Sequence, residues 1–271
     1  GDDIIDAGKD GDVVDGGSGA DTITAGAGDD TVYGGSGADD IDGGEGDDNI
    51  YGGMDNDTIT AGDGENTVYG DGGADTIVAG RDDDIIDGGM DADTITAGGG
   101  GDSIFGGMGT DEIVAGAGAD YIDGGYDDDT ITGGAGDDTV EGGYGQDTVL
   151  FDGVQDDFTF AVAPDGTLTV ADTTTALGTD VISGVETLRF NDGDLTVTTA
   201  QDGYVTLTGT GADDDVTVVG STAVTLEGVD GADTLTGGGG ADTITGASGD
   251  DVLEGGMGDD SITGDAGDDY I

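Results

Sequence analysis

Large aliphatic side chains recur every ninth residue through the first 150 residues of the chain. From Ala7 to Leu150 the sequence repeats, without insertion or deletion, the phrase G-G-x-G-x-D-x-U-x, in which U is a large aliphatic residue. Gly16–Thr24 is a clean copy, and Gly1–Asp6 is the tail of an earlier one. Such a fixed period predicts an architecture of stacked repeats, in which each repeat is one small supersecondary unit.

The eighth position of the repeat is always β-branched, which favours strands over helices. Side chains alternate along a strand, so the segment x-U-x places U inward and its two neighbours outward. The residues at this position are Ile5, Val14, Ile23, Val32, Ile41, Ile50, Ile59, Val68, Ile77, Ile86, Ile95, Ile104, Ile113, Ile122, Ile131, Val140 and Val149. Each repeat is therefore expected to contribute one short strand.

The sixth position is an aspartate in every copy but one. These residues are Asp3, Asp12, Asp21, Asp30, Asp39, Asp48, Asp57, Asn66, Asp75, Asp84, Asp93, Asp102, Asp111, Asp120, Asp129, Asp138 and Asp147. Asn66 is the exception, and its amide still offers an oxygen. A metal ion bound by oxygen atoms is the chemistry that such a row of short carboxylates favours.

The first half of each repeat predicts a tight turn. Glycine at positions 1, 2 and 4 permits positive φ and close backbone approach, so carbonyl oxygens can converge on a cation. Where position 4 is not glycine it is an aspartate, which tolerates the left-handed region better than most residues. These aspartates are Asp10, Asp55, Asp82, Asp91 and Asp127. Carboxylates and carbonyls together supply the six to eight oxygens that calcium takes.

The phrase resembles the RTX, or haemolysin-type, calcium-binding nonapeptide repeat, over residues 1–150 and again over about 228–271. The resemblance implies an all-β fold, a parallel β-roll (β-solenoid) in which two nonamers make one coil. It also implies multiple Ca²⁺ ions between turns stacked one coil apart, with all the sixth-position residues as ligands. Asp21 and Asp39, or Asp102 and Asp120, would then share an ion. The terminal turns at Asp3 and Asp269 lack a partner within this chain and are expected to bind more weakly.

The repeat returns in the last part of the chain. Its sixth positions are Asp233, Asp242, Asp251, Asp260 and Asp269. Just before it, Thr210–Val218 and Val219–Glu227 keep the length of nine but lose the pattern, with Val224 at the aspartate position. These two segments are interpreted as metal-free coils. Their register is open, because Gly209–Asp213 offers a competing frame.

Residues 151–227 contain less glycine and show alternating strand patterns. Strands are expected at Asp157–Ala163, Thr167–Asp172, Val185–Phe190, Leu195–Thr198, Tyr204–Thr208, Asp215–Val219 and Ala223–Leu226. A turn signal at Pro164–Gly166 predicts that the first two form a hairpin. Residues expected to form a small core are Phe151, Phe158, Phe160, Leu188 and Phe190. The predicted domains are a first roll at 1–150, a β-rich capping or linking module at 151–209, and a second roll at 210–271, with degenerate coils at 210–227.

Charge and composition narrow the function. The net charge of −61 excludes nucleic acid as a partner and opposes binding to anionic membranes. Only seven of the 64 acidic residues are Glu, and this bias toward the shorter acid favours aimed ligands over a generic solvated surface. The chain has no Cys and no His, which removes disulfides, histidine-bound metals and the usual catalytic triads. No apolar run is long enough to insert in a membrane, and no enzymatic activity is predicted.

The function predicted from the sequence is that of a calcium-binding structural module that folds when calcium binds. Each coil buries little apolar surface and crowds several carboxylates, so the chain without cations is expected to be unfolded. The resemblance implies a secreted or cell-surface bacterial protein exported by type I machinery. The chain is expected to be a fragment of a larger adhesin, surface-layer protein or exoprotein.

Two alternatives remain open from the sequence. A row of outward side chains, Tyr33, Tyr51, Tyr69 and Phe105, is interpreted mainly as stacking within the sheet. It is alternatively a contact face for a surface glycan or another copy of the chain, although acidic residues interrupt it. Thr-Ile-Thr triplets such as Thr22–Thr24 and Thr58–Thr60 resemble ice-binding faces, but Asp40–Asp42 between them breaks the array. The second alternative is a non-catalytic appendage of a secreted enzyme.

Overall fold

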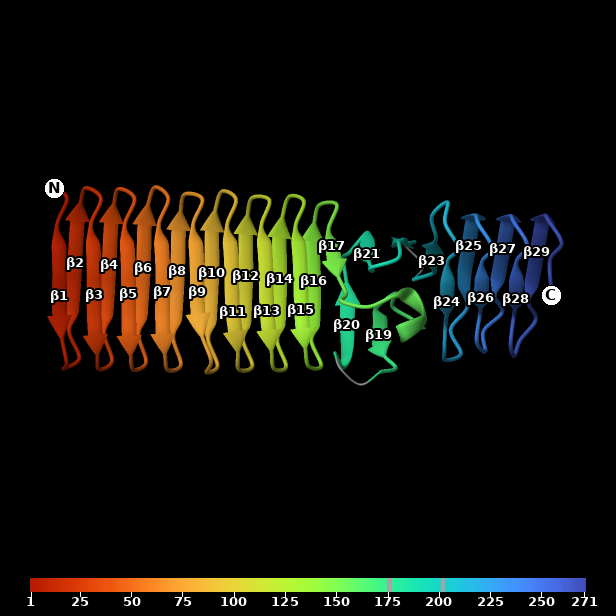
Figure 1. The fold of residues 1–271 in the computed structure, drawn as a ribbon, viewed down its shortest axis with the longest axis horizontal. Helices are drawn as coiled ribbons and strands as arrows, with labels where there is room; N and C mark the ends of the chain where they lie inside the picture. The colour runs from red at the N-terminus through yellow and green to blue at the C-terminus, as the bar shows by residue number, and fades with distance from the viewer. Residues whose placement is uncertain (175–176, 201–202) are drawn as a thin grey trace. The chain divides into compact units, whose positions relative to one another are not determined.

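The computed structural model describes residues 1–174, 177–200 and 203–271, and it consists almost entirely of strands (Figure 1). This part of the chain forms two compact units, Gly1–Asp147 and Thr148–Ile271. The all-β parallel β-roll predicted from the repeat is confirmed. Within the described residues there is no helix that could serve as a membrane span.

Each repeat of the first unit forms one strand, which spans positions 7 to 9 and the start of the next turn. The strands are β1 (Ile4–Gly8), β2 (Val13–Ser18), β3 (Thr22–Ala27), β4 (Thr31–Ser36), β5 (Asp40–Glu45), β6 (Asn49–Met54), β7 (Thr58–Asp63), β8 (Thr67–Gly72), β9 (Thr76–Gly80), β10 (Ile85–Met90), β11 (Thr94–Gly99), β12 (Ser103–Met108), β13 (Glu112–Ala117), β14 (Tyr121–Tyr126), β15 (Thr130–Ala135) and β16 (Thr139–Tyr144).

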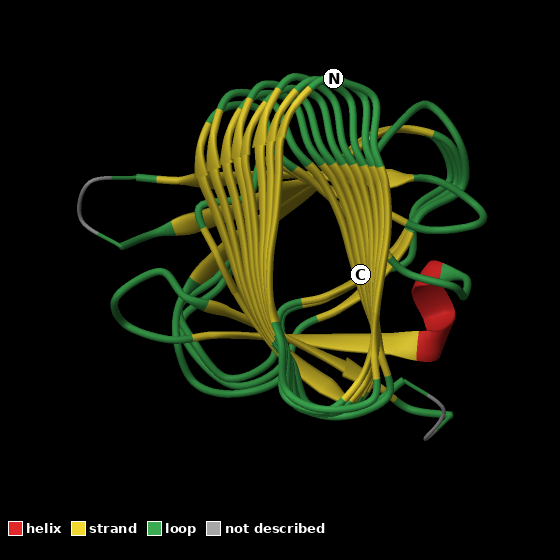
Figure 2. Cartoon of the chain, turned by 90° about the vertical axis from the view of Figure 1, so that its left-hand side faces the viewer, coloured by secondary structure: helices red, strands yellow, loops and turns green. Residues whose placement is uncertain are grey.

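Odd-numbered and even-numbered strands of this unit lie in two different sheets, which face each other across the interior (Figure 2). Neighbouring strands within a sheet are parallel, and their register advances by one coil: Ile5 pairs with Ile23, and Val14 pairs with Val32. One coil therefore spans two nonamers, as the resemblance to the nonapeptide repeat implies.

The interior of the first unit is a ladder of β-branched side chains. Ile50 and Ile86 are 0% exposed and Ile23 is 1% exposed. Thr22 and Thr24, on either side of Ile23 in strand β3, are exposed. Position 1 also faces inward and holds only Gly or Ala, with Ala25 fully buried. Each coil thus buries two large aliphatic side chains and little else, so its core is thin.

The turns use the left-handed backbone region that the glycine pattern predicts. Gly17 and Gly19, at positions 2 and 4, have φ of 90° and 118°. Asp55, Asp91 and Asp127 take the same region at position 4, with φ of 77°, 73° and 76°. Asp10 and Asp82 do not adopt this region. Asp71, at position 2, does so with φ of 69°.

The second unit begins with a short strand and a short helix, continues with mainly antiparallel strands, and ends in a second roll. Its elements are β17 (Thr148–Leu150), the 3₁₀ helix η1 (Gln155–Asp157), β18 (Phe158–Val162), β19 (Leu168–Asp172), β20 (Thr179–Ser183), β21 (Thr187–Arg189), β22 (Asp194–Thr199), β23 (Val205–Thr208), β24 (Asp215–Thr217), β25 (Val224–Asp230), β26 (Thr234–Thr236), β27 (Thr243–Ser248), β28 (Val252–Glu254) and β29 (Ser261–Ala266). Strands β18 and β19 form the predicted antiparallel hairpin. Strand β20, which pairs antiparallel with β19, was not expected from the sequence.

An aromatic cluster forms the core of the irregular part of the second unit. Phe151 stacks on Phe190 with ring centroids 5.2 Å apart, and Phe158 meets both rings at 5.2 and 5.1 Å. Phe160 packs edge-on against Phe190 at 6.1 Å. Leu188 is also buried, so the predicted small core is confirmed.

The register of the second roll corrects one sequence-based frame. Strand β25 pairs with β27 in the usual register of one coil, Thr225 with Thr243, whereas β24 pairs with β26 one residue further along, Asp215 with Thr234. The coil that contains β24 therefore follows the competing frame from Gly209, and the predicted frame Thr210–Val218 is wrong by one residue. Val218 is an extra residue between the two nonamers at 209–217 and 219–227.

Candidate metal centres in the turns

The sixth-position aspartates lie inside the turns, where they are shielded from solvent. Asp21, Asp48 and Asp93 are between 1% and 2% exposed. At the ends of the rows Asp3 is exposed, and Asp12, Asp260 and Asp269 are partly buried. Carboxylates are costly to bury unless they are paired, hydrogen-bonded or bound to a metal, so the surroundings of each oxygen decide what these residues do.

One oxygen of each carboxylate holds neighbouring coils together. The backbone N–H of Asp21 donates to Oδ1 of Asp39 at 2.8 Å, and that of Asp39 donates to Oδ1 of Asp57 at the same distance. The same bond, again between residues one coil apart, joins Asp84 to Asp102 at 2.8 Å. A charge-assisted hydrogen bond of this kind is stronger than one between neutral groups.

The other oxygen, Oδ2, is buried and has no hydrogen-bond partner among the described residues. This holds for Asp21, Asp30, Asp39, Asp48, Asp57, Asp75, Asp84, Asp93, Asp102, Asp111, Asp120, Asp129, Asp233, Asp242 and Asp251. Buried polar atoms without partners are rare in folded proteins and mark a proton, water or ion that completes the site. Here the same atom is left open in turn after turn, which fits a cation.

The pKa values of the same carboxyl groups report how poorly the protein alone stabilises their charge. Burial is the largest cause of the shift, neighbouring carboxylates such as Asp39 beside Asp57 add to it, and the backbone N–H bond opposes it. Groups whose pKa is raised to about 6 are Asp48, Asp75, Asp84, Asp102, Asp138 and Asp233, and groups whose pKa is raised to about 7 are Asp57, Asp93 and Asp129. A bound cation would reverse this penalty, since opposite charge favours the ionised form.

The backbones of consecutive turns lie close together around the carboxylate rows. Consecutive turns are joined by the position-4 amide, as where Gly19 N–H donates to the Ser36 carbonyl at 2.8 Å. The turns lie so close that a methyl group on Gly35 or Gly37 would collide with the carbonyl oxygen of the equivalent glycine one coil earlier. Among the described residues no three acidic side chains converge as a metal site. A cation in a turn would therefore combine carboxylate with backbone carbonyl oxygens.

Asn66 adopts the same pose as the aspartates but leaves a different atom open. Its Oδ1 accepts the N–H of Asp48 at 3.0 Å, as an aspartate would. Its Nδ2 donates to the carbonyl of Gly64, at position 4 of the same turn, at 2.9 Å. The amide oxygen that the sequence offered as a ligand is thus already engaged.

Asp214 is a sixth-position carboxylate that the sequence analysis did not include. It is 3% exposed, and its Oδ2 accepts the N–H of Thr210 at 2.7 Å. Its Oδ1 accepts Nε2 of Gln155 at 3.1 Å, and Gln155 Oε1 in turn accepts the N–H of Asp215 at 3.0 Å. In the competing frame that starts at Gly209, Asp214 is the sixth position, so the sequence did hold a signal for this residue. With both oxygens hydrogen-bonded, it differs from the open carboxylates.

The outer face of the even-numbered sheet carries the aromatic row noted in the sequence. Tyr33, Tyr51 and Tyr69 stack one coil apart, with centroids 5.0 Å apart in each pair. The rings thus contact each other, as the interpretation of stacking within the sheet requires. Binding of a glycan or another copy by this face stays a prediction, as does binding of ice by the sheet that carries the Thr-Ile-Thr triplets.

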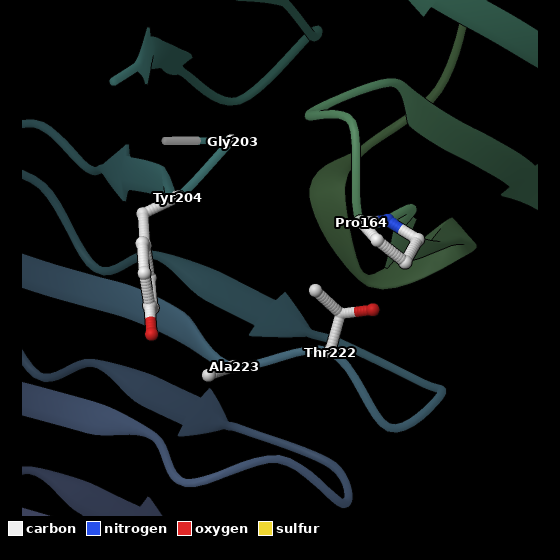
Figure 3. Close-up of a pocket in the computed structure, with 5 residues that line it drawn as sticks. All are labelled: Pro164, Gly203, Tyr204, Thr222 and Ala223. Atoms are coloured by element: carbon white, nitrogen blue, oxygen red, sulfur yellow. The ribbon is translucent and has the colours of Figure 1, made fainter. Parts of the chain in front are cut away.

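The surface of the second unit carries a hollow and an ion pair. The hollow in Figure 3 is lined by Pro164, Gly203, Tyr204, Thr222 and Ala223. Tyr204 is the one ionisable side chain among these residues. Arg189 pairs with Asp194 at 3.0 Å on the surface of the second unit.

Comparison with known proteins identifies the repeat. A family model described as RTX calcium-binding nonapeptide repeat (4 copies) matches residues 1–32, 15–50, 33–68, 51–86, 69–104, 87–122, 105–140, 123–157, 225–253 and 245–271. These matches cover more than half of the chain. No curated protein matches the sequence significantly.

Two solved structures are distantly similar. One is a hyperactive, Ca²⁺-dependent, β-helical antifreeze protein from an Antarctic bacterium, 19% identical with a TM-score of 0.33; the match covers 93% of this chain and 61% of that one. The other is the extracellular lipase LipA from Serratia marcescens, 17% identical with a TM-score of 0.21; the match covers 66% of this chain and 32% of that one. This chain thus spans less than two thirds of either structure. At these identities and TM-scores neither likeness bears on its function.

Proposed function

Because the chain belongs to the RTX calcium-binding nonapeptide repeat family, we propose that its turns bind Ca²⁺ and that this binding drives the folding of both rolls. The sixth-position residues are the proposed ligand positions, and backbone carbonyls of the turns supply the remaining oxygens. When bound, calcium supplies positive charge and six to eight coordination positions between successive turns. The role is structural rather than catalytic.

The single observation that carries the proposal is the buried Oδ2 atom without a partner. It recurs in both units, as in Asp93 and Asp233, while Oδ1 of Asp111 or Asp251 holds the neighbouring coil. An uncompensated buried charge destabilises a fold by about 3–5 kcal/mol. A cation at each of these turns would remove this defect, and so it would stabilise the roll turn after turn.

Calcium suits these turns better than magnesium. The oxygens come from backbone and carboxylate groups spread over two stacked turns, and the left-handed glycines set their spacing. Calcium tolerates irregular shells at about 2.3–2.6 Å, whereas magnesium demands near-octahedral geometry at about 2.0–2.1 Å and holds its waters. We therefore expect a strong preference for calcium.

Coupling between binding and folding follows from the thin core. Two aliphatic side chains per coil, such as Ile95 and Ile104, are the main apolar burial, and the chain carries a net charge of −61. Without cations the repulsion and chain entropy exceed this burial, so the free chain would be unfolded. Millimolar calcium outside the cell would fold it, which supports a secreted or cell-surface location and a place within a larger adhesin, surface-layer protein or exoprotein.

The test is far-UV circular dichroism of the whole chain titrated with calcium. In excess chelator the spectrum should be that of an unfolded chain, and calcium should convert it cooperatively to a β-rich one. Magnesium at the same concentration, and sodium chloride at matched ionic strength, should leave it unfolded. A β-rich spectrum that persists in chelator would contradict the coupling.

Matched variants assign the ligands. Asp39→Asn changes a buried sixth-position side chain, whereas Asp40→Asn changes the exposed residue beside it with the same loss of charge. Asp39→Asn is expected to lose at least one bound calcium per chain by calorimetry and to raise the calcium midpoint for folding. Asp40→Asn should match the unaltered protein. Equal calcium numbers in all three proteins would reject position 6 as a ligand.

A further inference from the structure

The aspartate rows along the two edges of the first roll are not equivalent, because one row contains an amide. This row runs Asp12, Asp30, Asp48, Asn66, Asp84, Asp102, Asp120 and Asp138, each one coil from the next. The facing row, from Asp3 to Asp147, is aspartate throughout. Asn66 lies in the interior of its row and is 1% exposed, so its behaviour is not an effect of the chain end.

The orientation of the Asn66 amide follows from its neighbour. The N–H of Asp48 needs an acceptor, and Asn66 Oδ1 provides it at 3.0 Å. A flipped amide would set the NH₂ group against this N–H, with two donors facing each other. Only one orientation is therefore compatible with the ladder, and it is chosen by hydrogen bonding.

The Nδ2 group consequently occupies the place that the open Oδ2 takes in the aspartates. It donates to the carbonyl of Gly64 at 2.9 Å. An amide NH₂ has no lone pair to offer a hard cation, and its hydrogens carry positive partial charge. The same group also takes up a turn carbonyl of the kind that would coordinate an ion in other turns.

We propose that the Asn66 turn is a built-in calcium-free turn, which divides its row of sites into one block ending at Asp48 and another beginning at Asp84. The inference rests on the proposed calcium binding. The amide makes internally the contact that an ion would make elsewhere, and it removes one negative charge from the row. In the folded roll this turn therefore needs no cation of its own, whereas turns with an open carboxylate do.

Two opposite substitutions in the full-length chain test this. Asn66→Asp restores the carboxylate, and it is expected to bind at least one more calcium per chain than the unaltered protein. Asp102→Asn places an amide in the same row, where Gly100 supplies the position-4 carbonyl, and it should lose as many ions as Asn66→Asp gains. Asn49→Asp, an exposed strand position with the same charge change, is the control and should leave the number unchanged. Bound calcium is counted by equilibrium dialysis with metal analysis.

A second readout does not depend on bound metal. In chelator, protonation of the buried carboxyl groups is expected to fold the chain; Asn66→Asp adds one more such group, so its β-type circular dichroism should appear only at a lower pH than in the unaltered chain, while Asn49→Asp should not change this pH. If Asn66→Asp binds no additional calcium while Asp102→Asn loses some, the Asn66 turn already holds an ion and the inference is wrong. If none of the four proteins binds calcium, the proposed function itself fails.

Discussion

A single carboxylate in these turns has two oxygens with different roles. In Asp57, Oδ1 accepts the N–H of Asp39 at 2.8 Å, and Oδ2 is buried without a partner. The sequence predicts that aspartate belongs at this position, since a short acid fits a tight turn. It does not reveal that one oxygen is engaged by the preceding coil. For this reason asparagine at position 66 cannot simply replace aspartate as a ligand. Its oxygen accepts the N–H of Asp48, so its NH₂ group takes the place of the open Oδ2.

Protonation of the buried carboxyl groups is expected to stabilise the fold, as calcium does, though to a smaller extent. Burial raises the pKa of Asp57, Asp93 and Asp129 from 3.8 to about 7. A carboxyl group whose pKa is higher in the folded state binds protons more tightly there. Without calcium, the free energy of unfolding is therefore highest below about pH 4 and falls as the pH rises to about 7. Acidifying the chain in chelator should induce β-type circular dichroism between about pH 7 and pH 5.

The midpoint of this acid transition separates two causes. Exposed carboxyl groups titrate near pH 4 and only reduce the overall charge. A transition confined to pH values below about 4 would therefore indicate general charge loss and contradict the role of the buried groups. With calcium present the dependence reverses, because protons compete with the ion for the same oxygens. Acidification should then release calcium, which a calcium-sensitive electrode would record.

At the scale of the element, the strand–turn repeat is almost fully readable from the sequence. The β-branched position predicts each strand of the roll, and glycines mark the turns, because each nonamer meets the same neighbours. Three features were not predicted. Strand β20 is a short segment outside the repeat, and the extra residue Val218 shifts one frame. Gln155 escaped for a different reason, since it lies far along the chain from the carboxylate it contacts, Asp214.

Gln155 is expected to stabilise the first coil of the second roll. Within the repeat, the position-6 peptide of one coil donates its N–H to the next carboxylate and accepts the next position-7 N–H, as Asp3 does from Thr22 at 2.9 Å. Gln155 makes both bonds with its side-chain amide, to Asp214 and Asp215. It therefore takes the place of a missing peptide group.

The substitution Gln155→Leu would leave both partners without their bonds. A loss of about 1–3 kcal/mol is expected for each buried group left unsatisfied. Urea unfolding in saturating calcium should show the lower free energy of unfolding, and hydrogen exchange of the Asp215 amide should accelerate. Gln146→Leu, at an exposed turn position, is the control. An unchanged exchange rate at Asp215 would show that the Gln155 amide is dispensable.

At the scale of the whole molecule, charge and cations set the dimensions of the chain. An uncharged unfolded chain of 271 residues has a radius of gyration of about 58 Å. Repulsion at a net charge of −61 should extend it further. Small-angle X-ray scattering in chelator is therefore expected to give at least this value, and calcium should lower it sharply. Sodium chloride should produce only a gradual contraction, because screening leaves each Oδ2 without a ligand; an equally sharp fall in salt alone would contradict this.

The assignment of alternate nonamers to opposite sheets limits how such a gene can change in length. A tandem duplication of two nonamers adds one coil and returns each downstream strand to its own sheet, as Ile23 follows Ile5. A duplication of a single nonamer would move every later strand to the other sheet. Residues downstream that now share a sheet with Tyr33 would then share a sheet with Thr24. Only insertions of whole coils therefore lengthen the roll without changing the sheet to which each later strand belongs.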